Sequence, residues 1–374
     1  MDRKSEIVEK SERLVRALGA QGMGGVLLGA QHNFTWLTAG GTNGIDQSRD
    51  PGAGALLVRG DGRRFALASR IEMARLQEEE LAGLDFEPVE FPWEEEKASP
   101  TFLADRARSL LEGGAGLGSD LPIGGDVPVV EGLVSRCRYR LTEGELERFR
   151  RLGSDSGRVL GEVMRGLQPG QSEAEVAAVA SSALAAEGIR AVVNLVASDE
   201  RIGKYRHPVP SARRWERVVM VVVCARRQGL IASLTRIVCA GEVPDELRRR
   251  TDACARVNAR LYAATRPGAT GAELYRTASE AYAEVGFPGE ENLHHQGGAA
   301  GYRTRDWVAH PASGEVVEDG QAFAWNPSVT GTKAEETCVA SRDAVEILTT
   351  TPGWPRIPIT LEGREYSSPD VLSL

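Results

Sequence analysis

The sequence predicts a two-domain protein of the mixed α/β class, in which a small first domain precedes a larger domain built from two similar halves. Three observations predict this. The chain has 374 residues, which is more than one hydrophobic core usually organises. Its pattern changes near residue 138, from short alternating strands and helices to long helices. Beyond that point, one pattern of turn, helix cap and helix occurs twice, at residues 167 and 265, an offset of 98.

The first domain, 1–137, is expected to be a small α/β unit. Apolar residues at helical spacing predict an opening amphipathic helix: Ile7, Val8, Leu14, Val15 and Leu18. The run G-V-L-L at 25–28 predicts a buried strand. The runs G-A-L-L-V (54–58) and F-A-L-A-S (65–69) flank R-G-D-G-R, whose glycines and aspartate favour a hairpin turn.

The second domain, 138–374, is expected to begin with a long helix and to contain an internal repeat. Thr142 and Glu145 have the spacing of a capping box. The segments 167–176 and 265–274 each predict a Pro-Gly turn, a second capping box and a new helix. The same offset pairs N-L-V-A (194–197) with N-L-H-H (292–295), and a slightly larger one pairs 229–235 with 331–337. Four features in one order favour duplication over chance, and two such halves can share a pseudo-twofold core with a site between them.

Composition and charge exclude several classes of protein. Hydrophobic residues are 41% and charged residues 26%, as in ordinary globular domains. A net charge of -8 argues against a nucleic-acid partner, which would need a clustered positive face. The longest apolar run, 218–225, is too short to span a bilayer, and the N-terminus has no signal-peptide core, so a cytoplasmic protein without membrane contact is expected. Five scattered cysteines without a C-x-x-C pair argue against both disulfides and structural zinc.

Four motifs of the second domain resemble those of the creatinase, aminopeptidase P and methionine aminopeptidase family. Q-G-L-I-A-S-L-T-R (228–236) is similar to the family's G-Y-x-S-D-x-T-R hairpin, and H-H-Q-G-G-A-A-G (294–301) to H-x-x-G-H-G-x-G. G-Q-A-F-A-W-N-P (320–327) is similar to G-M-V-F-T-I-E-P, and K-A-E-E-T-C-V (333–339) to R-x-E-D-T-x-x-V. The resemblance covers nearly the whole chain. It implies a creatinase-type α/β domain followed by a domain of the pseudo-twofold "pita-bread" fold.

The resemblance also implies a metal centre whose ligands this chain has lost. Metal-dependent members hold two divalent ions with two Asp, one His and two Glu. The matching positions here are Val222, Ser233, Gly298, Asn326 and Glu335. Only Glu335 keeps a carboxylate, and Arg305 stands where another histidine is usual and would repel a cation. No metal and no cofactor are therefore expected.

Creatinase and ectoine hydrolase, as the resemblance implies, hydrolyse carbon-nitrogen bonds without metal. His207, in K-Y-R-H-P-V-P, resembles the family's histidine-proline segment and is the candidate general acid and base. A histidine before proline can equally cap a turn. His294 corresponds to the family's substrate-contacting histidine, Glu335 is the expected substrate anchor, and His295 has no family role.

Five further residues are expected to bind substrate: Arg305, Glu336, Trp325, Asn326 and Trp36. If Glu335 and Glu336 are buried together, one could keep a proton; on an alternating strand, Glu336 would instead face solvent. Trp325 could equally be part of the core. Asn33, Phe34 and Trp36 match a family segment that packs near a neighbouring subunit's pocket, so the resemblance implies a homodimer.

The function expected from these residues is metal-independent hydrolysis of a carbon-nitrogen bond in a small amide or amidine. Creatinase has a glutamate where this chain has Thr235, so creatine is not the expected substrate. One alternative is a protein that binds a small molecule or short peptide without catalysis. Another is an Xaa-Pro peptidase with an unconventional metal, which the ligand chemistry favours least.

Overall fold

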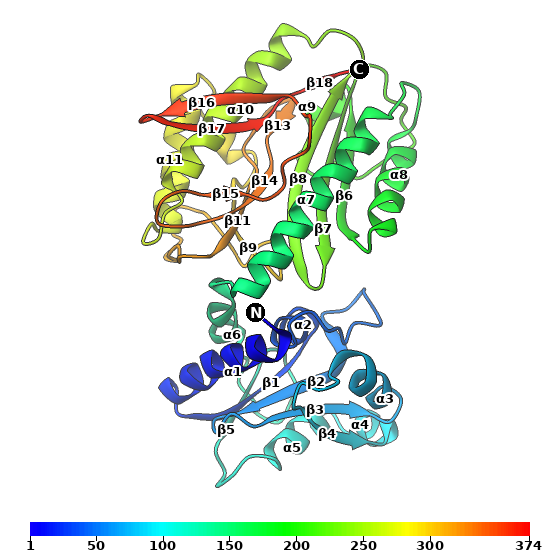
Figure 1. Ribbon diagram of the computed structural model, residues 1–374, viewed down its shortest axis with the longest axis vertical. Helices are drawn as coiled ribbons and strands as arrows, with labels where there is room; N and C mark the ends of the chain where they lie inside the picture. Colours follow the sequence, from blue (N-terminus) through cyan, green and yellow to red (C-terminus); the bar gives the residue numbers. More distant parts are fainter. The chain divides into compact units, whose positions relative to one another are not determined.

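The computed structural model describes residues 1–374, which divide into two compact units, Met1–Glu145 and Leu146–Leu374. The sequence suggested a boundary after residue 137. The division falls within helix α7 (Glu143–Arg165), whose first turn packs with the first unit. There the fully buried Lys10 ammonium forms ion pairs with Glu6 at 2.6 Å and with Glu145 at 2.7 Å. Figure 1 shows the elements of both units.

The first unit contains a mixed five-stranded sheet in the order β4-β3-β2-β1-β5. The predicted hairpin is formed by β2 and β3, with Ala55 opposite Leu67. The strands are β1 (Met23–Ala30), β2 (Pro51–Arg59), β3 (Arg64–Ser69), β4 (Glu87–Phe91) and β5 (Gly116–Ser119). The helices are α1 (Arg3–Ala20), α2 (Gln31–Leu37), α3 (Met73–Arg75), the π-helix η1 (Leu76–Glu80), α4 (Trp93–Ala98), α5 (Phe102–Arg108) and α6 (Glu131–Tyr139).

Helix α1 confirms the predicted amphipathic helix. The Asp2 side chain accepts a hydrogen bond from the Ser5 backbone N–H and so caps its first turn. Ile7, Leu14 and Leu18 are fully buried. Val8 is exposed, because each residue is rotated by about 100° from the one before it along a helix.

The second unit contains two larger sheets, in the orders β18-β8-β7-β6 and β10-β9-β11-β14-β15 (Figure 1). The first comprises β6 (Arg190–Ser198), β7 (Val218–Arg227), β8 (Leu230–Cys239) and β18 (Leu372–Ser373). The second comprises β9 (Gly297–Ala300), β10 (Trp307–Val308), β11 (Ala322–Trp325), β14 (Glu336–Val339) and β15 (Glu346–Ile347). Two ribbons are β12 (Ser328–Val329) with β13 (Thr332–Lys333), and β16 (Arg356–Leu361) with β17 (Arg364–Pro369). Besides α7, the helices are α8 (Glu173–Ala186), α9 (Glu200–Lys204), α10 (Asp245–Ala264), α11 (Gly271–Glu284) and the 3-10 turn η2 (Glu290–Asn292).

The repeat inferred from the sequence is visible in the helix starts. Ser172 with Glu175 and Thr270 with Glu273 each form a reciprocal capping box, opening α8 and α11. The paired segments N-L-V-A and N-L-H-H differ in local structure. The first lies within β6, whereas the second covers the last residue of η2 and the loop before β9, which begins at Gly297.

The two large sheets of this unit meet along β8 and β14. The Ser233 N–H donates to Thr337 Oγ1 at 2.7 Å, and that hydroxyl donates to the Ser233 carbonyl at 3.0 Å. Two residues further along β8, the Thr235 N–H donates to the carbonyl of Glu335, just before β14, at 3.1 Å. The observed mixture of sheets and helices confirms the predicted α/β class. None of the helices combines the length and apolar character that crossing a membrane requires.

Candidate active site

Three of the five histidines lie together in the second unit. His207 Nε2 is 3.2 Å from His294 Nε2, and the rings of His294 and His295 stack with their centres 4.5 Å apart. One ring nitrogen from each of the three histidines can be chosen so that all three nitrogens lie within 4.8 Å of one another. The structure thus brings together His207 and His294 from segments far apart in the sequence. It adds His295, for which the sequence offered no role.

Hydrogen bonds and ion pairs hold both histidine segments in place. Arg206, next to His207, pairs with Glu290 at 2.5 Å and donates to Thr330 Oγ1 at 2.8 Å. Glu290 lies in η2, so this ion pair connects the His207 loop to the turn that leads to His294. The Gln296 side chain donates to the His294 carbonyl. The two loops are therefore fixed to each other independently of the imidazoles.

Partial removal from water makes the three imidazoles poor bases, although only His294 is buried and His207 and His295 remain exposed. Burial lowers the pKa of His294 to about 2, with further lowering by the nearby Lys333 ammonium. Partial desolvation and the Arg305 guanidinium lower the pKa of His295 to about 4. Partial desolvation, followed by Lys333, also lowers the pKa of His207. All three rings are therefore neutral near pH 7, and in the His207–His294 contact one ring nitrogen donates and the other accepts.

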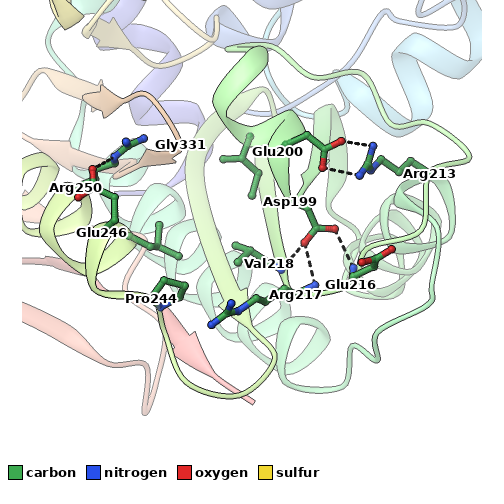
Figure 2. A pocket seen from close by; sticks show the side chains of 12 residues that line it. Asp199, Glu200, Arg213, Glu216, Arg217, Val218, Pro244, Glu246, Arg250 and Gly331 are labelled. Atoms are coloured by element: carbon green, nitrogen blue, oxygen red, sulfur yellow. Dashed lines mark hydrogen bonds and ion pairs between the residues drawn. The ribbon is translucent and has the colours of Figure 1, made fainter.

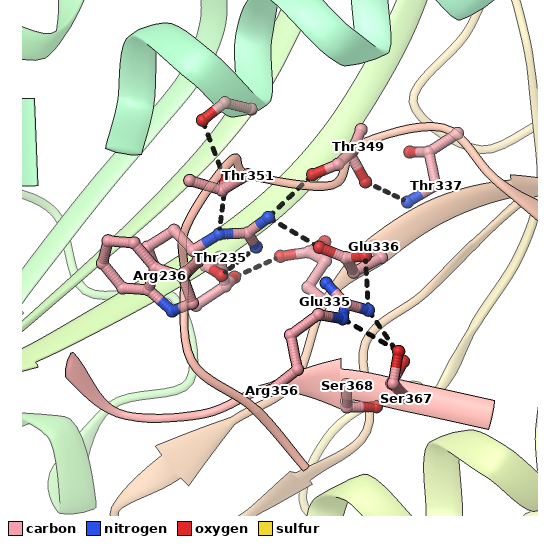
Figure 3. A network of polar contacts seen from close by, with 12 residues as sticks. Thr235, Arg236, Glu335, Glu336, Thr337, Thr349, Thr351, Arg356, Ser367 and Ser368 are labelled. Atoms are coloured by element: carbon pink, nitrogen blue, oxygen red, sulfur yellow. Dashed lines mark hydrogen bonds and ion pairs between the residues drawn. The ribbon is translucent and has the colours of Figure 1, made fainter. Parts of the chain in front are cut away.

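Glu335 and Glu336 point to different partners (Figure 3). Glu335 accepts a hydrogen bond from Thr235 Oγ1 at 2.7 Å and lies 3.5 Å from Arg305 Nη2. Glu336 accepts from Arg236 Nη2 at 2.6 Å and lies 3.4 Å from Arg356 Nη2. Each carboxylate has its own guanidinium partner, which is not the geometry of two carboxyl groups that share a proton.

The predicted role of Glu336 in substrate binding was wrong, and so was the alternative that it faces solvent. Glu336 and Arg236 are both fully buried. Arg236 also donates to the Thr349 carbonyl at 2.7 Å and to Thr351 Oγ1 at 2.9 Å (Figure 3). Strand alternation directs Glu336 away from Glu335, but the segment at 349–351 covers that face. Glu336 therefore stabilises the fold.

Two tryptophans expected to bind substrate belong to hydrophobic cores. Trp325 is fully buried, stacks on Phe323 and donates from Nε1 to Thr265 Oγ1 at 3.0 Å. Trp36 is fully buried in the first unit, with the Lys10 ammonium 5.7 Å from its ring centre. Neither ring presents a surface to a ligand, so both predictions were wrong.

The residues chosen as a subunit contact are also buried. Asn33, Phe34 and Trp36 have no exposed surface, and Asn33 donates to Asp120 at 2.9 Å within the first unit. A second subunit could not touch these side chains. The homodimer stays a prediction that rests on resemblance alone.

Asn326 remains a candidate. It follows β11 directly, and its backbone N–H donates to the Gln296 carbonyl at 3.0 Å, two residues from His294. Its side chain is buried, and Oδ1 has no hydrogen-bond partner. A buried amide oxygen without a partner is costly unless a ligand or water donates to it.

The residues at the five ligand positions do not fit a dinuclear metal centre. Val222 is a buried apolar residue, and the Ser233 hydroxyl donates to Cys224 Sγ at 3.3 Å. At Gly298 even a Cβ atom would lie 2.1 Å from the Trp307 carbonyl oxygen, because β9 and β10 approach each other closely. A histidine cannot stand there without displacing the neighbouring strand. A carboxylate is left at Glu335 alone.

A pocket of about 450 Å³ elsewhere in the second unit does not include the histidines (Figure 2). Three of its four acidic groups already have partners. Asp199 accepts three backbone N–H groups at 2.9 Å, from residues 216–218, and Glu200 pairs with Arg213 at 2.5 Å. Glu246 pairs with Arg250 at 2.7 Å. The remaining acidic group of the lining, Glu216, is exposed, and no histidine lies beside it in the pocket.

The fold and the order of the segments around the site define a member of a hydrolase family. Residues 147–349 match the model of "Metallopeptidase family M24", and the chain belongs to this family. It is 26% identical over 220 residues to the probable dipeptidase PepE of Mycobacterium tuberculosis, a match that spans 56% of this chain and only 58% of that relative.

Solved structures of similar proteins share the fold over almost the full chain. The prolidase from Pyrococcus horikoshii has a TM-score of 0.76 at 20% identity, covering 92% of this chain and 98% of that one. Dipeptidase PepE from Mycobacterium ulcerans has a TM-score of 0.75 at 19% identity, covering 94% and 97%. The Xaa-Pro dipeptidase from Bacillus anthracis has a TM-score of 0.73 at 20% identity, covering 92% and 98%. The predicted family and the pita-bread fold with its N-terminal domain are thereby confirmed.

Proposed function

We propose that this protein hydrolyses an amide-type carbon-nitrogen bond in a small substrate without a dinuclear metal centre. The observation that carries the proposal is the 3.2 Å contact between two neutral imidazoles, His207 and His294, beside the single remaining carboxylate, Glu335. The matched family model, which describes metallopeptidases, supplies the reaction class of amide-bond hydrolysis. The loss of the ligand set argues against the usual way of activating water in that family.

The proposed chemistry moves one proton through His207. The neutral imidazole accepts a proton from water as the water oxygen attacks the carbon of the scissile bond. The carbon-nitrogen bond then breaks, and the leaving nitrogen takes the proton back from the histidine pair. A lowered pKa makes His207 a weaker base but its protonated form a stronger acid, which favours protonation of a poorly leaving nitrogen. Glu335, held by Thr235 and Arg305, would orient the substrate by accepting from its N–H groups.

A second candidate is dipeptide hydrolysis with a single metal ion. The names of the similar proteins, which include a probable dipeptidase, a prolidase and an Xaa-Pro dipeptidase, support this candidate more directly than the first. The structural support is that His207, His294 and His295 can bring ring nitrogens within 4.8 Å of one another, in the neutral form that binds transition metals. A bound ion would polarise the peptide carbonyl. Against it stand the positive charges of Lys333 and Arg305, which act on the same imidazoles.

Metal analysis combined with an activity screen tests both candidates. The purified protein would be assayed for metal content and, before and after treatment with a chelator, against Xaa-Pro dipeptides, N-acyl amino acids and guanidino acids. The first candidate predicts turnover that survives the chelator and falls about 100-fold or more in His207→Ala. The second predicts turnover that the chelator abolishes and a transition metal restores.

The control variant is His310→Ala, because His310 is exposed and lies outside the histidine cluster. It should keep full activity under either candidate. A ligand that binds and is recovered chemically unchanged, with no turnover in the screen, would contradict both and favour a binding protein.

A further inference from the structure

The pocket of about 450 Å³ in Figure 2 has an apolar floor and does not include the histidine cluster. Ile202 of α9 lies in this floor with Val218 of β7 and Leu247 of α10, and all three are part of one apolar cluster or pack against it. Sites for small molecules are concave, largely apolar and of this size, with a few polar groups that orient the ligand. The pocket therefore has the form of a binding site for a molecule with an apolar body.

Arg217 is a cation at this pocket without a carboxylate partner. Its guanidinium donates to the Glu242 carbonyl at a long 3.4 Å and forms no ion pair. The neighbouring Glu216 has no ion pair either, but Figure 2 shows the two side chains extending in opposite directions, with Arg217 on the side of Pro244. The planar donor fork of an arginine matches the two oxygens of a carboxylate. Arg217 can therefore hold the anionic end of a ligand whose apolar body rests on the floor.

Asp199 joins two walls of the pocket in a strained conformation. It lies directly before α9 with a φ of 50° and a ψ of -125°, a combination that residues with a side chain rarely adopt. Its carboxylate accepts the backbone N–H groups of residues 216–218, each at 2.9 Å, where the chain enters β7. Strained residues of this kind cluster at ligand sites and switch regions. The strain therefore supports a binding role for the pocket.

Two walls of the pocket are connected to the loop that carries His207. Helix α9 ends at Lys204, just before this loop. Another wall includes Arg250, which donates to the carbonyl of Thr330. Thr330 Oγ1 in turn accepts a hydrogen bond at 2.8 Å from Arg206, the residue before His207. A ligand that displaces either wall therefore also displaces the His207 loop.

We propose that this pocket binds a small organic molecule with an apolar body and a carboxylate, and that its occupant changes the position of the His207 loop. Arg217 pairs with the carboxylate, and Ile202, Val218 and Leu247 contact the apolar body. The pocket contains none of the three clustered histidines, so the occupant is an effector and is not the substrate. The inference stands without the proposed function, because it concerns binding and the position of a loop.

A matched pair of probes tests the site by equilibrium binding. Naphthylacetate and naphthylacetamide share an apolar body and differ in charge, and their affinities would be measured by titration calorimetry. The wild-type protein should bind the carboxylate about tenfold more tightly or better. Arg217→Gln should lose that preference, and Leu247→Asn should weaken the binding of both probes. Arg342→Gln is the control, because Arg342 is exposed and lies outside the pocket, and it should keep the preference.

The position of the His207 loop would be followed through the ring signals of the five histidines in NMR spectra, with the His207 signal assigned by its loss in His207→Ala. Naphthylacetate should shift this signal in the wild type but not in Arg217→Gln. No binding, equal binding of the two probes, or a preference that survives in Arg217→Gln would overturn the site. A His207 signal that stays unchanged at saturation would overturn the influence on the loop. Since no outcome depends on turnover, failure of the proposed function would leave this inference intact.

Discussion

His207 Nε2 and His294 Nε2 lie 3.2 Å apart, and the two residues belong to loops that are joined by the Arg206–Glu290 ion pair. Contact between two unprotonated imidazoles costs little, whereas contact between two protonated ones would place like charges together in a partly buried site. The arrangement therefore depends on both rings remaining neutral, and this gives the stability of the protein a defined dependence on pH.

The first prediction concerns that pH dependence. The pKa of His294 is lowered to about 2 in the folded protein and is about 6.5 in the unfolded chain, so between these values only the unfolded chain binds the proton. Stability therefore falls as pH drops below about 6.5, by about 1.4 kcal/mol per pH unit for this one group. The free energy of unfolding would be measured with urea at a series of pH values. Its dependence on pH should be shallower in His294→Asn than in the wild type. His310→Asn is the control and should keep the pH dependence of the wild type. If the free energy of unfolding of His294→Asn depends on pH as steeply as that of the wild type, the prediction is contradicted.

The second prediction separates the two adjacent glutamates. Glu336→Gln leaves Arg236 without its carboxylate in a fully buried position, so the free energy of unfolding should fall by about 3–5 kcal/mol. Glu335→Gln leaves the Arg236 network intact and keeps an acceptor for Thr235. It should therefore affect activity more than stability. Urea unfolding and turnover would be measured on both variants. Equal losses of stability in the two variants would contradict the different roles predicted for Glu335 and Glu336.

The third prediction tests the two equivalent helix starts. Ser172 and Thr270 each accept the backbone N–H of a glutamate three residues later, at 3.2 Å in both cases. Ser172→Ala and Thr270→Ala should each lower the free energy of unfolding by about 1 kcal/mol. Thermal or urea unfolding of both variants would test this, with Ser135→Ala as a control because Ser135 is only half-buried and caps neither helix. A loss at one position alone would argue against equivalent roles in the two halves.

The features that the sequence predicted correctly depend on contacts between residues close in the chain. The β2–β3 hairpin and the capping boxes of α7, α8 and α11 each follow from a few adjacent residues. The family followed from segment motifs, which made His207 and His294 candidate catalytic residues but did not predict the contact between them. The sequence predicted the hairpin and the capping boxes because neither depends on how segments distant in the chain pack together.

The errors arose where burial decides the role of a residue. Trp36, Trp325 and Glu336 have plausible positions in the chain, but only the folded structure shows that other segments cover them completely. Lys333, a buried lysine that lowers the pKa of all three histidines, was missed for the opposite reason, since a lysine is expected at the surface. One signal was available: in K-A-E-E-T it stands two residues before Glu335, where the resembling motif has an arginine. Its burial near the histidines could be recognised only in three dimensions.

The last prediction concerns Gly298, the position that matches the family's metal-binding histidine. A Cβ built there would lie 2.1 Å from the Trp307 carbonyl oxygen and 2.8 Å from the Val308 Cα, both backbone atoms. Backbone cannot move aside as a flexible side chain can, so Gly298→Ala should lower the free energy of unfolding by about 1–3 kcal/mol or more. Gly314→Ala is a matched control, because no atom lies within 4 Å of its added Cβ. Urea unfolding of both variants would measure the difference. If Gly298→His instead folded with wild-type stability and bound two metal ions, the close approach of β9 and β10 would not be what prevents a metal centre at this position.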